Sequence, residues 1–176
     1  LLQQGQFKEA IAVSHQALAI EPQLERAHYN IGTAYIRQQR LDLAEPHLRR
    51  ALEIRPDMLP ALNNLGNIYQ RQGVWRQAMQ VYRRAQSIQQ HSSIDHNIGN
   101  TFLEAGFTDS ARVYFRRALD ADPQMREAYK GLVKASRAED LLQAAVDIQT
   151  ILMAQPFGDD TKERVSTLLQ HIAKQG

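Results

Sequence analysis

Apolar residues recur along the chain at the three- and four-residue steps of an amphipathic helix. In the stretch 28–38 they stand at Ile31, Ala34 and Tyr35, and the stretch 41–52 repeats the pattern. Short breaks follow at 39–40, 73–74 and 106–107. Because breaks of this length allow only a tight reversal, neighbouring helices are expected to run antiparallel. The pattern predicts an all-α chain built from helix pairs.

The helical pattern itself repeats about every 34 residues. Gly32 and Gly66 are 34 positions apart, and Gly99 follows 33 positions later. An aromatic residue stands three positions after each glycine, and two alanine series keep the same steps: Tyr35, Tyr69 and Phe102; Ala10, Ala44, Ala78 and Ala111; Ala17, Ala51, Ala85 and Ala118. We expect each glycine to face an alanine of the second helix, so that the two backbones approach closely. A period of this length is typical of a solenoid, in which each helix pair covers the apolar face of the next.

These positions resemble the tetratricopeptide repeat. The matching residues are Ile31-Gly32-x-x-Tyr35 with Ala44, Leu48, Ala51 and Pro56; Leu65-Gly66-x-x-Tyr69 with Ala78, Tyr82 and Ala85; and Ile98-Gly99-x-x-Phe102 with Ala111, Phe115, Ala118 and Pro123. The usual tryptophan of the family is replaced by His28, Leu62 and Asp95. The resemblance implies an all-α, right-handed superhelix, that is, an α-solenoid of antiparallel helix pairs.

The repeat register divides the chain into six segments. A partial repeat, mostly a second helix, is expected at 1–24, so the sequence begins inside a repeat. Complete repeats follow at 25–58, 59–91 and 92–125. A degenerate repeat is expected at 126–157, where Val133 and Ser136 replace the glycine and the aromatic residue. The stretch 158–176 is expected to form a C-terminal capping helix with one apolar and one polar face.

Composition narrows the function classes. The 21 basic and 19 acidic residues leave a net charge of +2, so no strong field attracts the chain to nucleic acid or to a membrane. The chain has no cysteine, which excludes disulfides, thiolate metal sites and a cysteine nucleophile. No apolar run approaches the roughly 20 residues needed to cross a bilayer. The excess of arginine over lysine indicates a bacterial source. The compartment stays open between the cytoplasm, which we favour, and the periplasm.

Recognisable catalytic motifs are missing from the sequence. It contains no glycine-rich phosphate loop, no G-x-S-x-G elbow and no H-E-x-x-H helix. The histidines stand at unrelated phases of the repeat and are interpreted as surface or partly buried side chains: His15, His28, His47, His91, His96 and His171. We therefore predict a chain that is not an enzyme and that needs no metal, cofactor or small-molecule substrate.

The candidate binding residues lie on the face of each first helix that points away from its own partner helix. In the tetratricopeptide family this face lines a concave groove. The predicted groove residues are Arg26, Tyr29, Asn30, Thr33 and Arg37 in the first complete repeat; Asn63, Asn64, Asn67 and Arg71 in the second; His96, Asn97 and Asn100 in the third; and Lys130, Lys134 and Arg137 in the fourth.

Three of these residues, Asn30, Asn64 and Asn97, stand two positions before the repeat glycines. A primary amide can donate to a peptide C=O and accept from a peptide N–H at once, so a row of amides suits an extended chain. The resemblance extends to a similar asparagine ladder in O-linked N-acetylglucosamine transferases. The alternative, weighed about equally, is that asparagine is simply tolerated at this position of the repeat. Basic residues outnumber Glu104 and Glu127 on this face, which favours an acidic segment as the guest.

We therefore predict a protein–protein interaction scaffold or adaptor that binds an extended, acidic segment in the groove. One alternative is a non-catalytic arm of a larger enzyme, such as a glycosyltransferase, or of a secretion or assembly machine. Another is self-assembly into a homo-oligomer through the N-terminal edge, where Leu1, Phe7 and Ile11 are apolar. A clamp for the acidic tails of heat-shock chaperones is disfavoured, since only Asn64 matches the residues that such repeats use.

A pair of arginines recurs at the same place in three successive second helices: Arg49-Arg50, Arg83-Arg84 and Arg116-Arg117. The pairs could form a stripe for phosphates, or they could be solvated side chains on the outer surface. We favour the solvated interpretation, because no regular aromatic residues accompany the arginines as base stacking would require. Nucleic-acid binding is therefore not expected.

Overall fold

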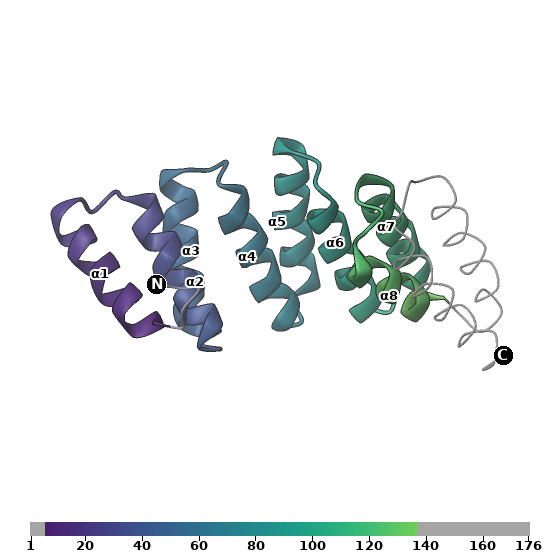
Figure 1. Cartoon of the computed structure of the whole chain (residues 1–176), viewed down its shortest axis with the longest axis horizontal. Helices are drawn as coiled ribbons and strands as arrows, with labels where there is room; N and C mark the ends of the chain where they lie inside the picture. The colour runs from purple at the N-terminus through teal and green to yellow at the C-terminus, as the bar shows by residue number, and fades with distance from the viewer. Residues whose placement is uncertain (1–5, 137–176) are drawn as a thin grey trace. The chain divides into compact units, whose positions relative to one another are not determined.

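The computed structural model describes residues 6–136 of the 176-residue chain. Every regular element in this range is an α-helix, which confirms the predicted all-α class (Figure 1). The helices are α1 (Phe7–Ile20), α2 (Glu25–Arg37), α3 (Leu41–Ile54), α4 (Leu59–Arg71), α5 (Trp75–Ile88), α6 (Ser92–Glu104), α7 (Thr108–Ala121) and α8 (Arg126–Ala135). Leu1, Arg137, the rest of the predicted degenerate repeat and the predicted capping helix lie outside the described residues.

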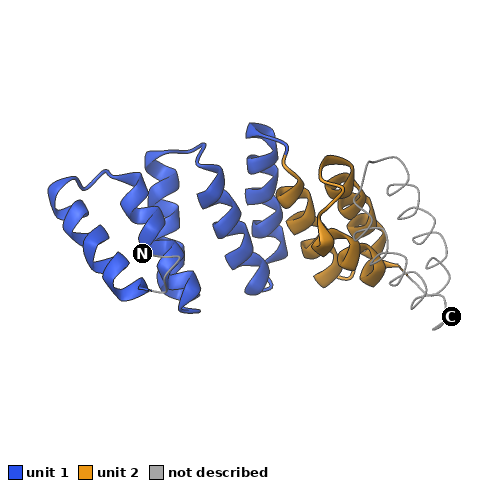
Figure 2. Ribbon diagram, viewed as in Figure 1, with its two compact units in different colours: residues 1–90 blue, residues 91–176 orange. Residues whose placement is uncertain are grey.

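The helices fall into two compact units, residues 1–90 and 91–176 (Figure 2). In unit 1, α2 packs on α3 and α4 on α5, while α1 covers α2 and α3 contacts α4. In unit 2, α6 packs on α7, and α8 contacts both α6 and α7. Each helix therefore has neighbours close in sequence, as expected where every pair leaves an apolar face for the next to cover.

The turn inside each helix pair is closed by the same backbone hydrogen bond. The amide of the residue that precedes the second helix donates to the carbonyl of the repeat aromatic: Arg40 to Tyr35 at 3.0 Å, Val74 to Tyr69 at 2.9 Å and Phe107 to Phe102 at 2.8 Å. This closure requires a left-handed residue just before the donor. Gly73 and Gly106 fill that position with φ of 73° and 85°, but Gln39 fills it in the first turn with φ of 60°.

The repeat glycines lie where a second-helix side chain leaves no room for a Cβ atom. A Cβ on Gly66 would lie 2.4 Å from the ring of Tyr82, and one on Gly99 would lie 2.8 Å from Phe115. Gly32 faces Leu48 in the same way, at 2.8 Å. The expected close approach is present. The side chain nearest to each glycine is a large one, and a Cβ on Gly32 would also lie 3.2 Å from the carbonyl oxygen of Ala44. Tyr82, Phe115 and Leu48 are fully buried and form the centre of each pair.

The apolar stripes predicted from the sequence form the core. In unit 1 the largest fully buried side chains include Ile31, Leu48, Leu62, Ile68 and Tyr82. In unit 2 a cluster forms around Phe115: Ala111, Ala118, Leu119, Ala128, Tyr129, Leu132 and Ala135 are buried with it. The polar faces of the first helices therefore remain available at the surface of each unit.

Candidate functional site

In unit 1 a hydrogen bond connects two first helices. The side-chain amide of Asn64 on α4 donates to the hydroxyl of Thr33 on α2, at 3.2 Å. Both residues belong to the predicted groove set, and both are half-buried. The structure thus brings together two predicted residues that are 31 positions apart in the sequence.

A pocket of about 380 Å³ opens beside the N-terminal end of α2. Three predicted groove residues line it, Arg26, Tyr29 and Asn30, and the rest of the lining comes from the turn after α3 and the start of α4: Arg55, Met58 and Pro60. Arg55 forms a long ion pair with Glu25, at 3.5 Å. Arg26 forms no hydrogen bond or ion pair with another residue of the range 6–136. Two guanidinium groups therefore line one pocket, and that of Arg26 forms no ion pair within residues 6–136.

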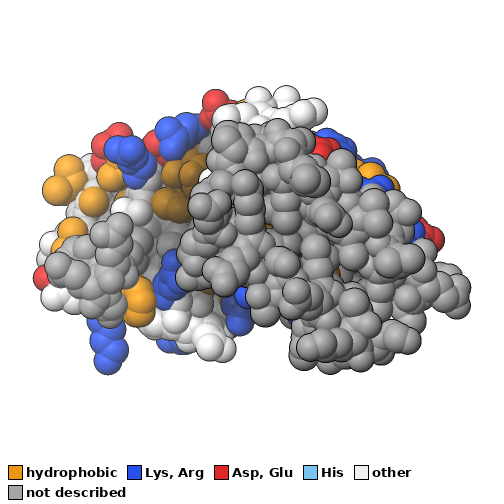
Figure 3. Space-filling view, turned by 45° about the vertical axis from the view of Figure 1, so that its right-hand side comes forward, with side chains coloured by type: hydrophobic (Ala, Val, Ile, Leu, Met, Phe, Trp, Pro, Cys, Tyr) orange, Lys and Arg blue, Asp and Glu red, His pale blue; other side chains and the backbone are white. Residues whose placement is uncertain are grey.

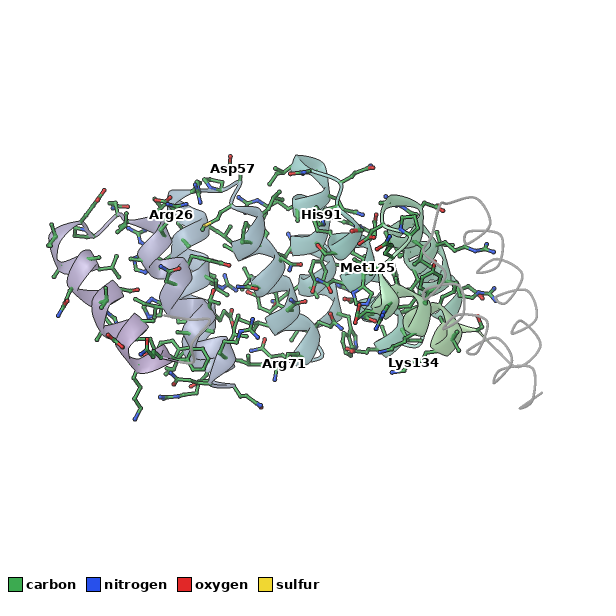
Figure 4. All side chains as sticks on the ribbon, viewed as in Figure 1. Arg26, Asp57, Arg71, His91, Met125 and Lys134 are labelled. Atoms are coloured by element: carbon green, nitrogen blue, oxygen red, sulfur yellow. The ribbon has the colours of Figure 1, made fainter. Side chains whose placement is uncertain are left out.

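The sequence did not indicate the contribution of Arg55, Met58 and Pro60. Arg55 and Met58 belong to the turn between repeats, which the proline at position 56 marks, and Pro60 lies in the first turn of α4. In Figure 4, Arg26 and the turn residue Asp57 lie towards one edge of unit 1, while Arg71 lies at the opposite edge. Arg37 and Arg71, at the ends of α2 and α4, are both exposed.

Asn67 occupies a different place from its predicted neighbours. The hydroxyl of the buried Tyr82 donates to the amide oxygen of Asn67 at 2.6 Å, and to that of Gln70 at 3.4 Å. The Asn67 oxygen is thus used within its own helix pair. Asn63, one turn earlier on α4, is also half-buried.

In unit 2 the predicted residues of α6 form a half-buried polar cluster. The amide of Asn100 and Nε2 of His96 are 3.3 Å apart, and the His96 ring lies 5.8 Å from that of Phe115. Burial lowers the pKa of His96, although Asn97 and the nearby Glu127 of α8 oppose the shift. His96 is therefore neutral at physiological pH and acts as a hydrogen-bonding group. Lys130 and Lys134 are exposed on α8.

The second arginine of each pair forms a hydrogen bond or an ion pair with another residue of the protein. Arg50 donates to the side chains of Glu53 and Gln23, at 2.7 and 3.3 Å, and Arg84 donates to the carbonyl of Pro56 at 2.7 Å. In unit 2, Arg117 lies 3.5 Å from the buried carboxylate of Asp95. Arg50 and Arg84 thus hold the turn that precedes their repeat, and Arg117 holds the first helix of its own repeat. Figure 3 shows basic and acidic side chains beside one another along the upper edge of the visible face.

Within residues 6–136, no three His, Asp or Glu side chains are arranged to hold a metal ion. None of the helices there combines the length and the apolar composition that a bilayer-crossing segment needs.

Known proteins support the interpretation of the repeats. Two tetratricopeptide-repeat sequence models match residues 23–91 and 96–152, and a third, described as a TPR repeat, matches residues 1–39. A Protein O-mannosyl-transferase of Caenorhabditis elegans, F38B6.6, is 32% identical over 79 residues, which cover 45% of this chain and 11% of that protein. The matched segment spans only about a tenth of the length of the curated relatives.

Solved structures share the fold at low sequence identity. The crystal structure of MamA superposes with a TM-score of 0.78 at 17% identity and covers 94% of both chains. YrrB, described as a TPR protein with an unusual peptide-binding site, superposes with a TM-score of 0.66 at 16% identity, over 84% of this chain and 77% of its own. The helix pairs, the repeat spacing and the sequence models agree, and the chain belongs to the tetratricopeptide-repeat family as an all-α solenoid.

Proposed function

We propose that this chain is a non-catalytic interaction module that holds an extended segment of a partner protein along its first helices. Tetratricopeptide-repeat proteins generally mediate protein–protein interactions, and this chain has the fold. The observation that carries the proposal is the polar surface of unit 1 formed by Arg26, Asn30, Thr33 and Asn64. We call these four residues the unit 1 groove.

The hydrogen bond between Asn64 and Thr33 prepares Asn64 to bind a peptide. Its Nδ2 is held by Thr33, and its Oδ1 accepts no hydrogen bond from another residue in the range 6–136. A carbonyl oxygen in a fixed orientation suits a peptide N–H, because little side-chain entropy remains to be lost on binding. Asn30, exposed on the preceding first helix, offers a second amide of the same kind.

Charge favours an acidic guest. Arg26 and Arg55 both line the pocket of about 380 Å³, and the long ion pair of Arg55 with Glu25 leaves much of the positive charge uncompensated. A carboxylate of the guest could bind both guanidinium groups through charge-assisted hydrogen bonds. Attraction of this kind is screened by salt, so the affinity should fall as ionic strength rises.

Binding of extended peptides to the 176-residue chain tests the proposal. Fluorescence anisotropy would compare acidic peptides with neutral peptides of the same length, for the wild type, for Asn30→Ala with Asn64→Ala, and for Arg26→Ala. Arg83→Ala is the matched control, since Arg83 is an exposed arginine on a second helix. We expect the double asparagine variant to weaken all peptides about tenfold or more and Arg26→Ala to weaken mainly the acidic ones.

Two results would reject the proposal. Equal affinity for acidic and neutral peptides would show that Arg26 does not select an acidic guest. Binding that is unaffected by the two asparagine changes would show that the peptide does not bind in the unit 1 groove. An equal loss in Arg83→Ala would mean that general charge, and not the pocket, attracts the peptide.

The alternative is that the repeats serve as an arm of a larger enzyme. The similarity to part of an O-mannosyl-transferase favours it, because that protein is far longer than the matched segment. On this hypothesis the groove would position a protein substrate for a catalytic domain. Expressing the natural gene in full and assaying glycosyl transfer, with and without residues 1–176, would separate the two functions.

A further inference from the structure

Three histidines from three successive helices of unit 1 lie together, although their spacing in the sequence gives no sign of it. They are His15 on α1, His28 on α2 and His47 on α3. The ring centroids of His28 and His47 are 5.5 Å apart, and those of His15 and His47 are 6.0 Å apart. The Nδ1 atoms of His28 and His47 face each other at 3.3 Å.

This contact limits the number of protons that the pair can hold. At 3.3 Å, one Nδ1 donates and the other accepts, so one of the two rings must present an unprotonated Nδ1. His28 also forms a hydrogen bond with the backbone of Pro22, which orients its ring. If both rings are protonated, two N–H donors face each other and two positive charges lie side by side. The second proton therefore breaks the contact between the two rings.

Most groups around the pair lower the two pKa values, although the backbone hydrogen bond to Pro22 raises that of His28. Burial is the largest effect, and it lowers the pKa of both His28 and His47 from the ordinary value of 6.5. His15 of α1 lowers both pKa values further, and His28 itself lowers that of His47. From α3, Arg50 lowers the pKa of His28 and Glu53 raises it. The ring of Tyr35 on α2 packs 6.0 Å from that of His47.

The packing itself does not require histidine at either position. In the next repeat, 34 positions later, the same places hold Leu62, which is fully buried, and Val81, which is half-buried. One repeat of unit 1 thus has two titratable rings where its neighbour has two aliphatic side chains.

We propose that His28 and His47 form a pH-sensitive contact that holds α2 against α3 when neutral and loosens that packing when protonated. The two histidines bind protons more readily in the unfolded chain than in the folded one. The contact therefore contributes its full stabilisation above pH 6.5, and the free energy of unfolding declines as pH falls below that value. α2 also carries Arg26, Asn30 and Thr33, so acidification would disturb the unit 1 groove. This last consequence rests on the proposed function, whereas the loosening of the helices does not.

Hydrogen exchange of the 176-residue chain tests the packing directly, without a peptide. After correction for the intrinsic pH dependence, we expect the amides of α2 and α3 in the wild type to lose protection several-fold between pH 7.5 and pH 5.0. The variant His28→Leu with His47→Val, which copies the next repeat, should keep the same protection at both pH values. His91→Asn is the control: it removes an exposed histidine of unit 2 but keeps an N-cap acceptor for α6. It should respond to pH as the wild type does.

The proposal fails if the double variant loses as much protection as the wild type, or if the wild type loses none. If the double variant does not fold, the imidazole resonances of the wild type decide. Below pH 6.5 the His28 and His47 signals should titrate late and in two coupled steps, and independent titration of both rings near 6.5 would overturn the contact. Peptide affinity plays no part in these measurements, so a failure of the groove proposal would leave them unaffected.

Discussion

Gln39 adopts a backbone conformation that glycine adopts in the two following turns. Its φ of 60° is left-handed, as are those of Gly73 and Gly106. A residue with a Cβ atom loses roughly 1 kcal/mol in this conformation. We expect Gln39→Gly to raise the free energy of unfolding by up to about 1 kcal/mol, and Gly73→Ala to lower it by a similar amount. Urea denaturation of the two variants would check both signs. If Gln39→Gly is destabilised, the glutamine side chain stabilises the fold by more than its backbone strain costs.

Gly66 tests the close approach between α4 and α5. Alanine is normally the better helix former by about 1 kcal/mol, so Gly66→Ala would be stabilising if space were available. A Cβ there lies 2.4 Å from the buried Tyr82 ring, whose hydroxyl is held by Asn67 at 2.6 Å. The ring has little freedom to yield, and we expect a net loss of about 1–3 kcal/mol. Thermal unfolding would measure it, with the exposed Arg71→Ala of the same helix as a control, and an equal or higher Tm for Gly66→Ala would contradict this packing.

Between helices, the prolines that end the repeats present carbonyl groups that need donors. Three different residue types supply them: His28 bonds to the backbone of Pro22, Arg84 donates to the carbonyl of Pro56 at 2.7 Å, and Tyr129 donates to that of Pro123 at 2.8 Å. His28 and Tyr129 occupy the tryptophan position of the family. On α4 the same position holds Leu62, whose side chain has no hydrogen-bond donor. Arg84 of α5 donates to the carbonyl of Pro56 instead. The arginine pairs thus have a role in joining elements.

The role of Arg84 can be separated from that of its neighbour. Arg84→Ala removes the hydrogen bond to the turn that precedes α4, and we expect it to lower the free energy of unfolding by about 1 kcal/mol. Arg83→Ala removes an adjacent, exposed arginine that forms no hydrogen bond or ion pair with another residue in the part of the chain that the structure describes. Chemical denaturation should find that variant nearly unchanged. Equal effects in the two variants would indicate that net charge, and not the bond to Pro56, determines stability here.

Across the whole molecule, the repeat period predicts the helix pairs well, because it depends on small and apolar residues spaced by local helix geometry. Side-chain partners depend on how two helices rotate against each other, and the spacing alone does not contain that information. The amide oxygen of Asn67, predicted for the groove, accepts a bond from Tyr82 in its own pair, while Arg55 enters the pocket from a turn. The contact of His28 with His47 escaped prediction for the same reason, since 19 residues separate them.

The first helix presents the strongest case for contact between copies of the chain. On α1, Val13 is 49% exposed and Ile20 is 87% exposed, while Phe7 and Ile11 of the predicted N-terminal edge are half-buried. A repeat normally covers such side chains with its neighbour, so we expect the 176-residue chain to self-associate through α1 as concentration rises. Sedimentation velocity over a wide concentration range should show this for the wild type.

Charge placed on α1 should abolish the association. We expect Val13→Glu with Ile20→Glu to remain a monomer at every concentration, because two carboxylates would have to be desolvated at the contact. Val113→Glu changes a side chain of α7 that is 56% exposed, and it should associate as the wild type does. A wild type that stays monomeric, or a Val113→Glu variant that dissociates equally, would show that α1 is not the contact. In that case the apolar side chains of α1 would be ordinary surface residues.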